Sequence, residues 1–212
     1  MNRLGRSVLT GATILGLTAC GPGGSGSAAG SYPTVPGSNS TCASATTVAG
    51  PNNGPETSPP GDIPDDQAFV AYASPDNLYT VKVPEGWART ESATGVTFTD
   101  KLNAIDVVVV NRPAAPTVDS VRTDEVLVLA ASAPCFHLGA VKTAERTAGM
   151  AVVVTYTADS SPDAVTGKVV NDDVERYEFW KDGKAVVLTL LGSAGSDNVD
   201  PWRIVTDSFA WR

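Results

Sequence analysis

Hydrophobic and polar residues follow two different patterns in the C-terminal three quarters of this chain. Leu78–Val83 alternates, with Tyr79, Val81 and Val83 on one side, as a half-buried strand does. Three later runs, 105–110, 150–156 and 185–191, are apolar at nearly every position. Because successive strand side chains point to opposite faces, such strands must be covered on both sides. The sequence therefore predicts a sheet that has helices above and below it.

Further strands are predicted by shorter patterns. Phe69–Ala73 is a short strand, and Arg89–Ser92 is expected to pair with Gly95–Asp100 as a hairpin. Asp182-Gly183 has the residue types of a tight type I′ turn, because both tolerate positive backbone angles. This turn predicts that Glu175–Lys181 pairs with the run that begins at Ala185.

Two segments are predicted to be the helices. Thr117–Ser132 carries its acidic residues in its first half, where the helix dipole favours negative charge, although its Val-Leu-Val-Leu centre would also suit a strand. Asp200–Ser208 has an N-cap residue in Asp200 and a proline, Pro201, at the first helical position. We therefore expect an α+β fold: an antiparallel twisted sheet of about six or seven strands with helices covering both faces, an α/β/α sandwich.

The first residues have the build of an export signal. A basic start with Arg3 and Arg6 precedes an apolar run over Val8–Ala19, which is too short to span a bilayer. The run ends in LTAC, which resembles the lipobox of bacterial lipoproteins, whose cysteine is acylated and becomes the first residue after cleavage. We therefore expect residues 1–19 to be a lipoprotein signal peptide and Cys20 to carry the lipid anchor. The alternative is an ordinary secretory signal with a chance cysteine.

Residues 20–62 are rich in Gly, Ser, Pro and Thr and have almost no charge. Such a segment buries too little apolar surface to offset its ordering entropy, so we expect a disordered tether. Residues 63–212 are expected to form one domain. The net charge of −8 falls further when the signal peptide, with Arg3 and Arg6, is removed. This acidity excludes nucleic acid as a partner and leaves the lipid as the contact with the membrane.

Few residues suggest metal binding or catalysis. The chain has one histidine, His137, and two acidic groups, 172–175 and 197–200, that do not match a calcium loop. No Gly-x-Ser-x-Gly elbow and no phosphate-binding glycine loop occurs. We therefore predict no catalytic residue, no metal and no cofactor. A hydrolase would require His137 to lie within hydrogen-bond reach of a serine or a carboxylate.

The two remaining cysteines and one tryptophan are candidate functional residues. Cys42 and Cys135 would pair as a disulfide in an oxidising compartment outside the cytoplasm, the alternative being two unpaired thiols. Trp180 is predicted to share a face of its strand with Arg176 and Glu178, and an aromatic side chain beside charges is a possible partner contact. Packing over the sheet is the alternative for Trp180.

Two stretches, YTVKVPEGWARTE and DPWRIVTDSFAWR, together with the order of the predicted elements, resemble the PsbP-like fold. That fold is shared by a photosystem extrinsic subunit, a nuclear-import factor and several lipoproteins of actinobacteria. The resemblance implies binding of partners or ligands rather than catalysis, and it assigns no functional residue. We therefore expect a non-catalytic binding or assembly module that is anchored by lipid to the outer face of the cytoplasmic membrane, with an envelope protein as partner. The alternative is a carrier of an apolar or lipid-derived small molecule in a cleft between sheet and helix.

Overall fold

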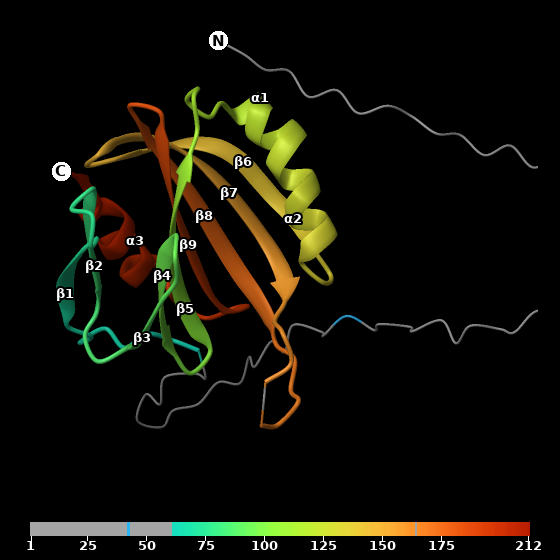
Figure 1. The fold of residues 1–212 in the computed structure, drawn as a ribbon. Coiled ribbons are helices and arrows are strands. Elements are labelled where there is room, and N and C mark those ends of the chain that lie inside the picture. Colours follow the sequence, from blue (N-terminus) through green and yellow to red (C-terminus); the bar gives the residue numbers. More distant parts are fainter. Residues whose placement is uncertain (1–41, 43–60, 164) are drawn as a thin grey trace, which may run out of the picture. The chain divides into compact units, whose positions relative to one another are not determined.

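The computed structural model describes Cys42, residues 61–163 and residues 165–212, and Figure 1 shows how their strands and helices are arranged. The described strands are β1 (Phe69–Ala73), β2 (Tyr79–Pro84), β3 (Ala88–Glu91), β4 (Gly95–Asp100), β5 (Asn103–Asn111), β6 (His137–Arg146), β7 (Gly149–Asp159), β8 (Asn171–Lys181), β9 (Lys184–Ser193) and β10 (Ala210–Trp211). The described helices are α1 (Val118–Ser120), the π-helical segment η1 (Val121–Glu125), α2 (Val126–Ser132) and α3 (Val199–Ser208). The first three helical segments follow one another without a break, and we call them the α1–α2 helix.

The main sheet has seven antiparallel strands in the order β3-β4-β5-β9-β8-β7-β6. The predicted hairpin at Asp182-Gly183 is confirmed, because Lys181 pairs with Lys184 and the two turn residues have φ angles of 49° and 82°. The predicted pairing of β3 with β4 is also confirmed. The α+β architecture that the hydrophobic pattern predicted is therefore present.

One face of the main sheet is covered by α3 and by a second sheet, in the order β1-β2-β10. We call this the α3 face. Its core is one cluster in which Phe209, just after α3, stacks on Phe179 of β8 with ring centroids 4.2 Å apart. Trp87 packs against the same cluster. Sequence patterns placed β1 and β2 as strands but did not separate them from the main sheet.

The opposite face carries the α1–α2 helix, and we call it the helix face. The predicted helix over Thr117–Ser132 is confirmed, and the strand alternative for its centre is wrong. Thr117 and Ser120 form a reciprocal capping box at the first turn. The buried residues between the helix and the sheet form a small cluster of valines from both elements: Val121, Val126, Val141, Val152 and Val154. The helix therefore rests on less apolar surface than α3 does.

The start of α3 differs from the prediction. The helix begins at Val199 and its N-cap is Asn198, so Asp200 lies in the first turn and is not the cap. The N–H of Trp202 donates to the carbonyl of Asn198 at 3.0 Å, which places the first helical bond two residues before the predicted start. Pro201 is tolerated there because the first N–H groups of a helix have no partner within the helix. Neither β6 nor β10 was predicted from the sequence.

Candidate functional site

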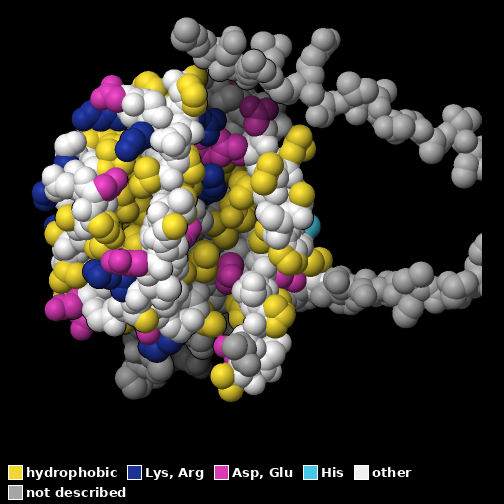
Figure 2. Space-filling model, in the orientation of Figure 1, with side chains coloured by type: hydrophobic (Ala, Val, Ile, Leu, Met, Phe, Trp, Pro, Cys, Tyr) yellow, Lys and Arg dark blue, Asp and Glu magenta, His cyan; other side chains and the backbone are white. Residues whose placement is uncertain are grey.

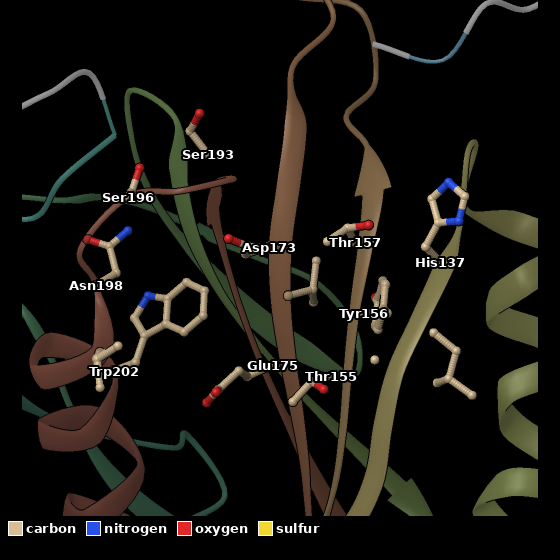
Figure 3. A pocket seen from close by; sticks show the side chains of 14 residues that line it. His137, Thr155, Tyr156, Thr157, Asp173, Glu175, Ser193, Ser196, Asn198 and Trp202 are labelled. Atoms are coloured by element: carbon tan, nitrogen blue, oxygen red, sulfur yellow. The ribbon is translucent and has the colours of Figure 1, made fainter. Parts of the chain in front are cut away.

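A cavity of about 470 Å³ lies on the α3 face, between the ends of β6, β7 and β8 and the segment that leads from β9 into α3. Figure 3 shows its labelled side chains, with Asn198 and Trp202 on one side and His137 on the other. A volume of this size falls in the range of small-molecule sites. The cavity is therefore the candidate binding site.

Two cross-strand pairs form the floor of the cavity. Thr157 of β7 lies opposite Asp173 of β8, and Thr155 lies opposite Glu175 in the next pair of the same face. All four side chains line the cavity and are only half-buried. Antiparallel pairing thus brings two hydroxyls and two carboxylates together on adjacent strands.

A bulge in β6 shapes the side of the cavity that lies next to Thr155. The register between β6 and β7 shifts between Leu138 and Ala140, so that Gly139 is the extra residue. The N–H of Ala140 donates to Oγ1 of Thr155 at 3.0 Å, and a Cβ on Gly139 would lie 2.7 Å from that oxygen. The close approach explains why a glycine stands at the bulge.

Asn198 fixes the other side, at the start of α3. Its amide oxygen accepts from the N–H of Ile63 at 2.8 Å, and its amide nitrogen donates to the carbonyl of Gly61 and to Oδ1 of Asn103, both at 3.0 Å. These bonds hold α3 in position and with it Trp202, whose indole lines the cavity and is 9% exposed. A side chain in place of Gly192 would collide with both asparagines, since its Cβ would lie 2.6 and 2.7 Å from their amide atoms.

Each floor carboxylate uses one oxygen in a hydrogen bond to the protein. Oδ2 of Asp173 accepts from the N–H of Gly195 at 3.0 Å, and Oε2 of Glu175 accepts from the hydroxyl of Tyr177 at 2.7 Å. Burial and the neighbouring Glu175 raise the pKa of Tyr177, so its hydroxyl stays protonated and donates. Arg146 donates to that same hydroxyl at 2.7 Å. Both carboxylates are thereby held in place at the cavity lining.

The cysteine prediction is confirmed in part. Cys42 and Cys135 form a disulfide with Cα atoms 5.6 Å apart, which ties a residue of the predicted tether to the segment after α2. Cys20, the predicted signal peptide 1–19 and most of the predicted tether 20–62 lie outside the described residues. Within the described part of the chain, no helix is long and apolar enough to cross a membrane.

Trp180 and His137 are not brought together. Trp180 shares a face of β8 with Arg176 and Glu178, as predicted, and that face is the helix face. Its Nε1 donates to the carbonyl of Arg112 at 2.7 Å. Its predicted role as a partner contact stays a prediction. His137 begins β6 and lines the cavity. Within residues 61–163 and 165–212 it makes no hydrogen bond to a serine hydroxyl or a carboxylate.

The cavity residues Asp173 and Glu175 belong to the acidic group 172–175, which the sequence distinguished only as a group that does not match a calcium loop. Asp172 of this group is buried, at 8% exposed, whereas Asp173 and Glu175 line the cavity. The alternation along β8 was the available signal, since it places Asp173 and Glu175 on the same face as Tyr177. Which elements close over that face is a tertiary property, and it was not visible in the sequence.

Comparisons with known proteins identify no family for this chain. No protein-family model matches the sequence, and no curated protein matches it significantly. Among solved structures, the chain is similar to cyanobacterial PsbP (CyanoP) from Synechocystis sp. PCC 6803, with 15% identity, a TM-score of 0.48 and coverage of 69% of this chain and 94% of that one. It is also similar to LpqN of Mycobacterium tuberculosis, described as involved in cell envelope biogenesis, with 13% identity, a TM-score of 0.41 and coverage of 69% and 91%.

A third similar structure is a protein from Bacteroides thetaiotaomicron VPI-5482, with 13% identity, a TM-score of 0.45 and coverage of 67% of this chain. This chain spans about half of that protein's length, 48%. At such identities the likeness concerns the fold alone, and it transfers no partner, ligand or site residue.

Proposed function

We propose that this chain is a lipid-anchored protein of the cell envelope whose domain binds a small molecule in the α3-face cavity and catalyses no reaction. The cavity is the observation that carries the proposal. It is bordered by four strands and the start of a helix, and its polar groups are held in place by Asn198, Gly195 and Tyr177. Preorganised polar groups around a concave volume are what small-molecule sites share.

A cavity-filling substitution tests the binding function. The full chain is purified under native conditions, and small molecules bound to it are detected by native mass spectrometry and by NMR shifts of the cavity amides. Thr157→Phe places an aromatic ring in the cavity and should abolish binding. Thr90→Phe, on the exposed strand β3, makes the same change away from the site and should leave binding intact. Equal binding by wild type and Thr157→Phe would contradict the proposal.

The lipid anchor is tested separately. Cells that express the full chain are labelled with palmitate, and the protein is isolated from the membrane fraction. Label should enter the wild type and be lost in Cys20→Ala, because the thiol at that position is the predicted acylation site. A wild-type chain that stays unlabelled would rule out this part of the proposal and leave the cavity to be judged by itself.

The helix face favours a second candidate function, the carriage of an apolar ligand between sheet and helix. Figure 2 shows hydrophobic side chains along α2 and in the hollow between this helix and β4 and β5. Leu127 and Val128 of α2 are 67% and 65% exposed, and Val110 of β5 is 37% exposed. Organic extraction of the native protein followed by mass spectrometry should return a lipid if this candidate is right. The α3-face cavity suits such a ligand poorly, because carboxylates and hydroxyls form its floor.

A further inference from the structure

We infer that the α3-face cavity takes an organic cation, a ligand with an amine or quaternary ammonium group. The inference rests on the proposed binding function of this cavity and adds the chemical class of the ligand. Two independent observations carry it: the cavity has an aromatic side chain in its wall, and the charges that face it are negative and form no ion pair within the described residues.

The floor of the cavity is negatively charged. Asp173 and Glu175 line the cavity, and no lysine or arginine does. Within the described residues neither carboxylate forms an ion pair with a basic side chain. Arg146 reaches Glu175 only through the hydroxyl of Tyr177, and it also lies 3.5 Å from the carboxylate of Asp207. Two negative charges on neighbouring positions of one strand face are thus left without a cation.

The positive end of the α3 dipole does not cancel the negative charge of the two carboxylates. A helix N-terminus carries the equivalent of roughly half a positive charge, against two full charges on the floor. Asp200 in the first turn of α3 offsets part of even that half charge. The electrostatic potential in the cavity is therefore negative, and a bound cation would relieve the repulsion between the two carboxylates.

Trp202 supplies the complementary surface for the rest of such a ligand. Its indole lies on the helix side of the cavity, across from Thr155 and Thr157 (Figure 3). Ammonium groups are attracted to the face of a tryptophan, and methyl groups on the nitrogen pack against it. A neutral polyol would form hydrogen bonds with the same carboxylates and hydroxyls but would leave their charge uncompensated.

The experiment compares choline with 3,3-dimethylbutan-1-ol, its neutral isostere, and follows the amide signals of cavity residues in NMR titrations of the full chain. Choline should shift these signals and bind about tenfold more tightly than the isostere, which corresponds to one favourable charge interaction. The double variant Asp173→Asn/Glu175→Gln should weaken choline binding by about tenfold or more and leave the isostere unaffected. Glu85→Gln removes an acid from an exposed turn and should change nothing.

Three results would overturn the inference. Equal binding of choline and its isostere, or choline binding that survives the loss of both carboxylates, would show that charge does not select the ligand. Shifts of the cavity amides by glucose or glycerol but not by choline would show a neutral-ligand site. Each of these three results would still be compatible with the proposed binding of a small molecule in the cavity. If no probe of either charge shifts the cavity amides, the proposed function fails together with the inference.

Discussion

The two faces of the main sheet are closed by different chemistry. On the α3 face, Phe179, Phe209 and Tyr79 stack within a large apolar cluster, and the buried polar groups there are neutral. On the helix face, a small group of valines is accompanied by both buried carboxyls of the described chain, Asp172 and Glu178. The first face depends on apolar burial, whereas the second depends also on the charge state of a few side chains.

The charges of the helix face form one network. Glu178 has a fully buried side chain, and it pairs with Arg112 at 2.8 Å and with Arg176. Both arginines also pair with Glu125 of the α1–α2 helix, Arg176 at 3.1 Å. Glu125 is the last residue of the π-helical segment η1, so the helix contacts the network where its winding is irregular. Single π-helical turns inside α-helices are frequent at functional sites. The network therefore links the helix to β8 where apolar contacts are few.

The largest difference between the faces should follow from large-to-small substitutions. Phe179→Ala should lower the free energy of unfolding by about 4 kcal/mol, because it leaves a cavity beneath Phe209. Val154→Ala on the helix face removes two methyl groups and should lower it by about 2 kcal/mol. Urea denaturation followed by circular dichroism measures both values. Equal losses would mean that the two faces do not differ in apolar packing.

The next largest effect is on pH dependence and involves Asp172. Burial, and then the nearby Asp159 and Asp173, raise the pKa of Asp172 to about 7. A carboxyl whose pKa is higher in the folded state binds more protons there than in the unfolded chain. Its contribution to stability is complete below about pH 4 and is lost as the pH rises through about 7, amounting to up to about 4 kcal/mol. Burial also raises the pKa of Glu178 to about 7, which acts in the same direction.

The test is to measure the free energy of unfolding of wild type and Asp172→Asn between pH 4 and pH 8. Wild type should lose stability over this interval, and the variant should lose less, so that it is the more stable protein at pH 8. Asp65→Asn, at an exposed position, serves as the control and should follow the wild type. A variant whose curve runs parallel to the wild type would show that Asp172 does not contribute.

Elements with a strong local pattern were predicted from the sequence, whereas an edge strand with little buried surface was not. Runs that are apolar at consecutive positions predicted a sheet covered on both sides, and Asp182-Gly183 predicted its best hairpin, because these are properties of neighbouring residues. β6 was not predicted, since its one buried side chain is Val141 and its register is broken by the bulge at Gly139. An edge strand with so little buried surface leaves a weak periodic signal.

The sequence placed the residues of the candidate site in strands and helices, but it did not predict that they come together in one cavity. Asp173 and Glu175 stood in an acidic stretch, and Trp202 stood in a helix that was predicted with nearly correct bounds. Their convergence depends on Asn198, which joins Gly61, Ile63 and Asn103 over more than ninety residues of sequence. Contacts at such separations are not encoded in any local pattern. The same holds for Glu178, which the sequence placed only on one face of its strand and whose side chain is fully buried.

The charge network allows a third, smaller effect to be measured. Arg176→Met leaves Glu178 buried with one arginine in place of two and should lower the free energy of unfolding by about 3 kcal/mol. The double variant Arg176→Met/Glu178→Met removes the incompletely paired carboxylate as well and should recover part of that loss. If the loss in the double variant equals the sum of the losses in Arg176→Met and Glu178→Met, the two side chains are not coupled, and the helix face does not depend on their pairing.

The smallest effect concerns how the two helices begin. The α1–α2 helix starts with a capping box, in which the hydroxyl of Thr117 accepts from the N–H of Ser120 at 3.1 Å, whereas α3 has no side-chain cap. Thr117→Ala should therefore lower stability by about 1 kcal/mol. Thr123→Ala, in the same helix, removes a hydroxyl that accepts from no helix N–H and should have a smaller effect. Hydrogen exchange of the amides over 118–122 should accelerate only in Thr117→Ala. Acceleration in both variants would show that this helix, which rests on few apolar contacts, frays wherever it loses a hydroxyl.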